Sequence, residues 1–409
     1  MFSDKSGVSL QTLLLITTVA FVSGIKTFTV TPDKDTTIYI NSTKASSCKV
    51  RKCVPGSKLN RHCDRIFTLN KNTRVTIEFD CPRPEEEFTV EIVRNIACTS
   101  TLCGRIIQSD GGSSGLLDFP RIFTWKIKAY PQKSFQINFA ETGLKQIAPT
   151  DSCNDKHTYT LRAADVLLGK YCLSGPISKA QILNQGSFSL DLPAGQRLRP
   201  GRFDVSVVAK IHTSANISVT LQEGSLSSTL MSPNYPRSFP DNDVMEWYFQ
   251  VPSKHKAAIK LLNLKLPTCL KDQTGLEYSS RGKTQVVRLD KVQPEQNEGS
   301  FSLRLRNCKM DTTRSGSVGL SVKFNVSAYQ GFKTFTVTPD QDTTIHINST
   351  EASSCKVCKR VPGSELNRHC DRIFTLNKNT RVTIEFDCPR PEEEFTVEIM
   401  RNIGKTNVN

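Results

Sequence analysis

Cysteine is the residue type whose number and spacing most clearly imply chemistry in this chain. The 409 residues include 14 cysteines, and thiols at this density either pair as disulfides or bind a metal as thiolates. Zinc is the alternative for one group of residues: Cys48, Cys53, His62 and Cys63. A zinc site needs reduced thiolates and usually a short-spaced ligand pair, which adjacent His62 and Cys63 do not supply. We therefore predict disulfides and no metal or cofactor.

The N-terminal residues favour the oxidised state, because they form an export signal. In residues 1–24 a lysine precedes a mostly apolar stretch, and small residues follow at a cleavage site. No later window reaches the roughly 18 apolar residues that span a bilayer. We predict entry into the secretory pathway. The chain as written would be secreted, and as part of a longer protein it would lie at the cell surface in a single-pass membrane protein.

Two kinds of short motif predict covalent processing. Asn-X-Ser/Thr sequons predict glycosylation at Asn41, Asn216, Asn325 and Asn348. Dibasic pairs just before a Val-Pro-Gly turn predict exposed loops that trypsin-like extracellular proteases can cut, at Arg51 and Lys52 and at Lys359 and Arg360. The alternative for both pairs is ordinary solvated charge between two strands.

The formal net charge of +15 does not identify a partner. Basic residues are scattered among acidic ones and gather in two clusters: Arg197, Arg199 and Arg202, and Lys254, His255, Lys256 and Lys260. Such clusters can attract anionic glycans weakly, and ordinary solvated surface is the alternative. We expect no nucleic-acid binding, because no such motif accompanies the charge and the chain carries an export signal.

No residue pattern indicates an enzyme. The chain has six histidines and contains neither an HExxH nor a GxSxG motif. The run from Ser109 to Ser113, Ser-Asp-Gly-Gly-Ser, is similar to the loop around a protease serine. No histidine or aspartate partner lies in a recognisable context, so we interpret this run as a loop.

The elements that must position these residues are clearest in a stretch that the chain contains twice. Residues 333–403 repeat residues 26–96 with seven substitutions in 71 positions, through recent duplication or an error in the gene assembly. Val75, Ile77 and Phe79 alternate with polar residues, which indicates half-buried antiparallel strands. No window shows a helical period, so the repeat predicts a small β-sandwich-like module.

The rest of the chain has the same strand character and divides into two further modules. Alternating stretches surround both tryptophans, Trp125 and Trp247, which we assign to the core. The fold class is therefore all-β, a tandem array of β-sandwich modules. We predict a signal peptide (1–24), an N-terminal module (25–103), a second module (104–223), a third module (224–328) and a truncated second copy of the N-terminal module (329–409).

The third module resembles a CUB domain. Residues 230–240 contain the pattern S-P-x-Y-P-x-x-F-P, an aromatic strand begins at Trp247, and residues 318–324 fit the closing strand. The second module shows the same layout in weaker form around Trp125, so it is CUB-like. The resemblance implies jelly-roll-type β-sandwiches. The third module departs from the pattern at Met245, where many CUB domains have a cysteine, so one usual disulfide is absent.

Many CUB domains bind calcium through an acidic loop, and the corresponding segment here is residues 275–282. Gly275 and Arg281 stand where aspartates are expected. Because calcium needs several oxygen ligands and an arginine opposes it, we expect no calcium site.

The cysteines predict three disulfides within these modules. The second module holds only two cysteines and the third only two, and the CUB resemblance implies that the latter pair is bonded. The first module has six, which allow 15 connectivities. The second copy keeps four and lacks counterparts of the last two, which indicates that those two pair. The predicted bonds are Cys153–Cys172, Cys269–Cys308 and Cys98–Cys103, and the pairing of Cys48, Cys53, Cys63 and Cys81 is open.

The order of the modules resembles a family of CUB-domain surface glycoproteins, over essentially the whole mature chain. In that family the modules form the ectodomain of a single-pass protein linked to cell adhesion and, through a cytoplasmic tail, to Src-family kinase signalling. The resemblance implies extracellular or cell-surface proteins as binding partners. The alternative is a secreted soluble binding protein, or decoy, without a membrane anchor.

Overall fold

The computed structural model describes most of the three N-terminal modules and the strands of the last one. The described residues are 25–42, 48–53, 62–63, 66–69, 73–98, 102–223, 227–311, 318–330, 333–340, 343–349, 356–360, 368–371, 373–376, 381–387 and 395–401. The predicted signal peptide, residues 1–24, lies outside them. No helix in these ranges is long and apolar enough to cross a bilayer.

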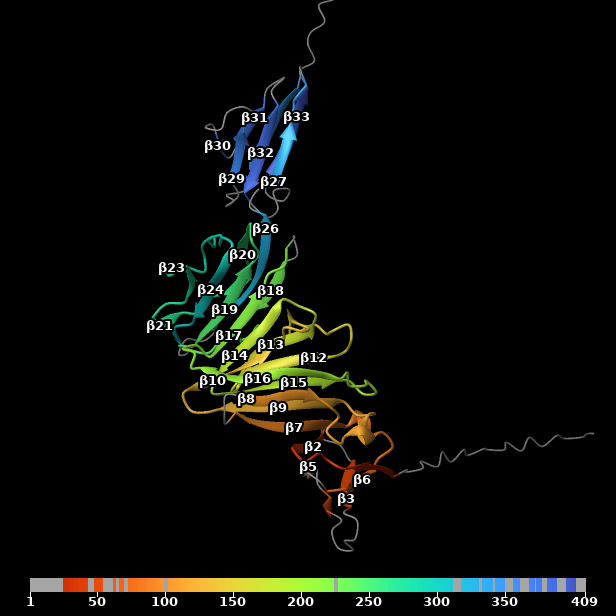
Figure 1. Cartoon of the computed structure of the whole chain (residues 1–409). Helices are drawn as coiled ribbons and strands as arrows, with labels where there is room; N and C mark the ends of the chain where they lie inside the picture. The colour runs from red at the N-terminus through yellow and green to blue at the C-terminus, as the bar shows by residue number, and fades with distance from the viewer. Residues whose placement is uncertain are drawn as a thin grey trace, which may run out of the picture.

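The described residues are almost entirely β-strand, which confirms the predicted fold class (Figure 1). Two 3-10 turns, η1 (Pro84–Glu86) and η2 (Ser114–Leu116), interrupt the strands. The first module contains β1 (Lys26–Val30), β2 (Thr36–Ser42), β3 (Lys49–Cys53), β4 (His62–Cys63), β5 (Ile66–Leu69), β6 (Val75–Asp80) and β7 (Phe88–Cys98).

The first module is a sandwich of two sheets, β1-β6-β3-β4 and β5-β2-β7. Val75, Ile77 and Phe79 are buried between them, because alternate residues of a strand point to the same face. The predicted alternation in β6 is therefore correct.

The second module is also a sandwich. Its strands are β8 (Leu102–Gln108), β9 (Arg121–Ala129), β10 (Lys133–Asn138), β11 (Leu144–Ile147), β12 (Thr158–Ala163), β13 (Val166–Leu173), β14 (Ile177–Leu183), β15 (Gln185–Leu192), β16 (Gly201–Ala209) and β17 (Ala215–Thr220). One sheet runs β9-β15-β12-β13-β11 and the other β8-β16-β10-β14-β17. Trp125 is buried between them and packs on Phe188, at 6.1 Å between ring centroids.

The third module has the same layered arrangement. Its strands are β18 (Ser228–Met231), β19 (Val244–Val251), β20 (His255–Lys265), β21 (Cys269–Lys271), β22 (Gly275–Ser280), β23 (Lys283–Val287), β24 (Gly299–Arg306), β25 (Lys309–Met310) and β26 (Ser321–Gln330). Sheet β18-β26-β20 faces sheet β19-β24-β22-β23, and Trp247 packs edge-on against Phe324 between them. Both tryptophans are core residues, as expected.

The three modules share one 17-stranded sheet, because each boundary is crossed by a pair of parallel strands. β7 of the first module pairs with β9 of the second, and β17 of the second pairs with β19 of the third. At both boundaries the closing strand of one module lies beside the tryptophan strand of the next. One apolar core runs through all three modules.

The second copy of the repeat is separate from this sheet and has its own small core. Figure 1 shows it, in blue, at the end of the molecule opposite the first copy. It contains β27 (Lys333–Val337), β28 (Thr343–Ser349), β29 (Lys356–Arg360), β30 (Arg368–Asp371), β31 (Ile373–Leu376), β32 (Val382–Asp387) and β33 (Phe395–Arg401). Its sheets, β27-β32-β29-β30 and β31-β28-β33, reproduce those of the first module.

Candidate interaction surfaces between the modules

The boundary between the first and second modules is built on the parallel pair β7–β9. Nine register pairs join the strands, from Val90 opposite Arg121 to Cys98 opposite Ala129. The Val90 amide donates to the Pro120 carbonyl oxygen at 3.0 Å. Parallel strands that follow one another in a chain need a crossover connection. Residues 99–120 form it here, and their described part, 102–120, contains β8 and the turn η2 instead of a long helix.

Arg94 on β7 holds the two modules together with four hydrogen bonds. Within the first module its Nε donates to Thr36 Oγ1 at 3.1 Å and its Nη2 pairs with Asp33 Oδ2 at 3.2 Å. Toward the second module Nη1 donates to the Ile107 carbonyl oxygen at 2.9 Å and Nη2 to Ser109 Oγ at 2.6 Å. The planar guanidinium provides this fork of donors, so one side chain fixes both partners.

The run 109–113 is a loop, as predicted, and it docks on the first module. The Asp33 amide donates to the Gly111 carbonyl oxygen at 3.1 Å. Gly112 has φ +81°, and a Cβ there would lie 1.9 Å from the Thr31 carbonyl oxygen. Only glycine permits both this backbone conformation and this approach. Gly111 and Gly112 therefore allow the loop to pack closely against the first module.

The same segment completes the core of the first module. Leu116 in η2 and Phe119 are fully buried, and the Phe119 ring lies 5.1 Å from that of Phe28 and 5.3 Å from that of Phe79, centroid to centroid. Burial of a phenylalanine side chain contributes roughly 1.5–3 kcal/mol. The first module thus depends on side chains from the second for a closed interior.

A buried arginine lies at this boundary. Arg121 begins β9 with its side chain over the Phe123 ring, and it donates to the Gln196 carbonyl oxygen. Burial lowers the Arg121 pKa, and the nearby charge of Asp110 raises it in part. Across the strands, Thr124 Oγ1 donates to Glu91 Oε1 of the first module at 3.0 Å.

The second boundary uses buried amides. The Met231 amide donates to Gln146 Oε1 at 3.0 Å, and Gln146 Nε2 donates to the Leu168 carbonyl oxygen at 3.2 Å. Asn234, in the Ser-Pro-Asn-Tyr-Pro run that carries the CUB resemblance, bonds to Leu167 of the second module. That run therefore both opens its own module and docks it on the preceding one.

Four disulfides join cysteines that both lie within the described residues. They are Cys98–Cys103, Cys153–Cys172, Cys269–Cys308 and Cys48–Cys81. The first three are the pairings expected from the sequence, and the fourth was open. Cys98–Cys103 was expected within the first module, but Cys103 lies on β8 of the second module, so this bond joins the two modules. Because Cys48 is bonded to Cys81, it is not available as a zinc thiolate. In the second copy Cys358 is disulfide-bonded and lies opposite Cys370 in the register of β29 and β30.

The four predicted glycosylation residues all lie on strands and are half-buried. They are Asn41 on β2, Asn216 on β17, Asn325 on β26 and Asn348 on β28. Asn325 Oδ1 accepts a hydrogen bond from Thr229 Oγ1 at 2.7 Å, which leaves its Nδ2, the atom that carries a glycan, unaffected. Glycosylation stays a prediction at each.

The dibasic pairs do not lie in loops, contrary to the expectation for a protease site. Arg51 and Lys52 are on β3, which pairs with both β6 and β4, and Lys359 and Arg360 are on β29, which pairs with both β32 and β30. The Val-Pro-Gly residues that suggested a loop lie outside the described residues. A protease needs unpaired, extended backbone, so cleavage at these pairs requires local opening of the sheet.

The segment expected to correspond to the calcium loop is a β-hairpin. Gly275 begins β22, and Arg281 and Gly282 form the two-residue turn into β23, with φ +49° and +76°. Positive φ at both turn positions is typical of hairpin connections. In the described part of the chain, no group of three or more His, Cys, Asp and Glu side chains is arranged to hold a metal ion.

The two basic clusters are partly neutralised by their own neighbours. Arg199 pairs with Asp155 at 3.1 Å, and Lys256 lies 3.7 Å from Glu295. His255 is buried, with Nδ1 2.8 Å from the Ser253 carbonyl oxygen. Weak binding of anionic glycans stays a prediction that rests on the remaining exposed cations: Arg197, Arg202, Lys254 and Lys260.

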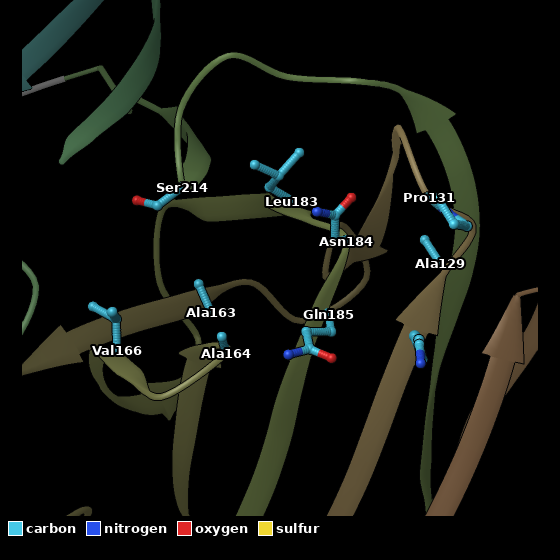
Figure 2. A pocket seen from close by; sticks show the side chains of 10 residues that line it. Ala129, Pro131, Ala163, Ala164, Val166, Leu183, Asn184, Gln185 and Ser214 are labelled. Carbon is cyan, nitrogen blue, oxygen red and sulfur yellow. The ribbon is translucent and has the colours of Figure 1, made fainter.

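A shallow hollow of about 550 Å³ lies at one end of the second module (Figure 2). Small apolar side chains line it, among them Ala129, Pro131, Ala163 and Val166. Lys128 is the single ionisable residue among its lining residues. The hollow therefore offers mainly apolar contact area for a partner side chain.

Sequence reasoning missed the contact roles of Arg94 and Gln146. The sequence does contain a pattern that indicates the first boundary. Adjacent Ile92 and Val93 are apolar on opposite faces of one strand, which is typical of a strand covered on both sides. The pair Gly111-Gly112 similarly indicates a close backbone approach.

Three family models, each described as a CDCP1 CUB domain, match the chain. One matches residues 26–98 and again 333–405, another matches 105–208, and the third matches 213–323. Together with the layered β-modules these matches define a tandem CUB-domain protein. The chain belongs to the CUB domain-containing protein 1 family.

Relatives and solved structures are similar to this chain to different degrees. CUB domain-containing protein 1 of Homo sapiens is 28% identical over 355 residues, covering 83% of this chain and 42% of the relative. The Mus musculus protein of that name is 30% identical over 335 residues, covering 78% and 40%. The chain thus spans about two-fifths of the length of these relatives. The CUB1-EGF-CUB2 domains of rat MASP-1 match at 10% identity and TM-score 0.20, over 57% of this chain and 99% of that one.

Proposed function

We propose that this chain is the protein-binding extracellular region of a cell-surface adhesion or receptor-type glycoprotein. Membership of the CUB domain-containing protein 1 family supports an extracellular CUB-domain protein. Roles in adhesion and in Src-family kinase signalling belong to the proposal, because they come from the family resemblance. The chain acts by binding, without catalysis, and the secretory pathway delivers it.

The continuous sheet is the observation that carries this proposal. Three modules held by parallel strand pairs and by one core form an elongated body whose loops keep fixed relative positions. A pre-organised surface loses less conformational entropy on association than modules on flexible linkers. Such a body suits the binding of an extended extracellular partner.

Cell binding by the mature chain tests the proposal. Residues 25–409, secreted from animal cells and fluorescently labelled, should bind intact cells saturably. Binding should disappear when the cells are first treated with protease and persist after heparinase. Loss of binding after heparinase would assign the interaction to anionic glycans instead of proteins. Absence of saturable binding across a panel of cell types would contradict the proposal.

A further inference from the structure

The two copies of the repeat have nearly the same sequence on the strands that correspond to the first boundary, with Met400 in place of Val93, and they have different surroundings. In the first copy Val90 and Ile92 on β7 are 0% and 2% exposed, beneath residues 109–120 and beside β9. Their counterparts on β33, Val397 and Ile399, are 58% and 62% exposed. The difference in burial between the two copies therefore shows which side chains of the first module the second module covers.

The open surface of the second copy extends beyond β33. Phe335, the counterpart of Phe28, is 50% exposed, because no described residue takes the place of Phe119 beside it. On the opposite face of the strand Met400 is also exposed, where the equivalent Val93 is buried. Several large apolar side chains exposed near one another mark a surface that an interaction partner covers.

The backbone of β33 is open in the same direction. β33 pairs with β28 and with no other described strand, whereas its counterpart β7 pairs with both β2 and β9. In the first copy the Val90 amide donates to Pro120, across the boundary. By alternation along the strand, the amides of Val397, Ile399 and Arg401 face the open edge.

The polar contacts are available as well. Asp340 and Arg401 repeat Asp33 and Arg94, and both are exposed in the second copy. The carbonyl oxygen of Thr338 repeats that of Thr31, against which Gly112 packs. The second copy thus presents the apolar, backbone and charged groups that bind the second module in the first copy.

We propose that this open surface is the docking site for a further CUB module of the kind formed by residues 104–223, joined in cis after the repeat. The module would pair its tryptophan strand in parallel with β33 and insert a leucine and a phenylalanine beside Phe335. Continuity with the β7–β9 boundary supports this occupant, and the relatives are more than twice as long as the part that this chain matches. The inference goes beyond the proposed function and does not depend on it.

An extended chain tests the proposal. Residues 99–223 would be added after residue 405, with Lys405→Cys so that the added copy of Cys103 has its bonding partner. Residue-resolved hydrogen exchange should slow at least about tenfold at Val397 and Ile399. The amides of Thr396 and Glu398 face β28 in either state and should change little, which gives an internal control.

A matched variant distinguishes docking of the added module on β33 from an effect of the longer chain alone. Gly112→Ala in the added module alone would place a Cβ against the Thr338 carbonyl oxygen and should return exchange at Val397 to its rate in the original chain. Protected strands within the added module would show that it is folded. Unchanged exchange at Val397 beside a folded added module would overturn the proposal. So would a concentration-dependent dimer of the original chain that protects β33, since a second copy would then be the occupant.

Discussion

Asn234 and Leu167 exchange two hydrogen bonds across the boundary between the second and third modules. The Asn234 amide donates to the Leu167 carbonyl oxygen at 2.7 Å, and the Leu167 amide donates to Asn234 Oδ1 at 3.0 Å. Asn234 has φ +59°, a conformation that asparagine adopts more readily than most residues. A turn of the third module thus pairs with the second module much as one strand pairs with another.

Arg94 offers a comparison within one molecule, because Arg401 is the same residue in the second copy. Arg94→Ala should destabilise the β7–β9 boundary by on the order of 2 kcal/mol, since it removes four hydrogen bonds, two of them to the neighbouring module. Arg401→Ala, at an exposed position, should change stability by less than about 0.5 kcal/mol. Hydrogen exchange of β7 and β33 amides measures both. Equal losses in the two variants would contradict the assigned role.

Gly112 should be intolerant of a single added methyl group. Gly112→Ala must strain a backbone at φ +81° and also displace the Thr31 carbonyl oxygen. Gly195→Ala is the matched control, since Gly195 has φ +74° and no atom within 4 Å of the added Cβ. We expect Gly112→Ala to cost about 1–3 kcal/mol more than the control in thermal unfolding. Similar costs would show that strain alone, without the contact, decides the outcome.

The strands and the tryptophan cores were predictable because each leaves a local pattern. Val75, Ile77 and Phe79 alternate with polar residues, and each tryptophan lies within an alternating run. The joining of modules into one sheet was not predictable from that pattern. A period of two reports which face of a strand is buried and carries no information on which strand lies at its edge.

The dibasic pairs show how a local signal misleads. Val-Pro-Gly after the pair favours a turn, so a loop was expected to include the basic residues themselves. Arg51 instead occupies an inner strand, where Val50 beside it is buried against the core. The apolar Val50 therefore predicts the strand position of Arg51 better than the Val-Pro-Gly sequence that follows.

Gln146 should contribute substantially to the stability of the boundary between the second and third modules. Gln146→Leu keeps the approximate volume and leaves the buried Met231 amide without its acceptor, which costs about 1–3 kcal/mol. Gln181→Leu is the control, because the bond from Gln181 to Gln136 is only partly buried and water can replace it. Denaturant unfolding of the two variants compares them. A larger loss for Gln181→Leu would contradict the importance of the boundary amide.

Asp243 lies just before β19, at the boundary with the second module, and should make the stability of the protein depend on pH. Burial raises the Asp243 pKa, while hydrogen bonds from the Val244 amide and the Ser214 hydroxyl lower it in part. The folded protein therefore holds this proton more strongly than the unfolded chain, in which an aspartate has a pKa of about 3.9. Its contribution is fully present below that value and is lost as pH rises through the raised pKa of the folded state.

Asp243→Asn removes this titration and keeps an acceptor for the Val244 amide. The stability of the original chain relative to the variant should therefore fall as pH rises from about 3 to 7. Asp290→Asn is a control of opposite sign, because Arg288 lowers the pKa of exposed Asp290; there the relative stability should rise slightly over the same range. Urea unfolding at several pH values measures both differences. A flat difference for Asp243→Asn would show that its carboxyl group is as well solvated in the folded protein as in the unfolded chain.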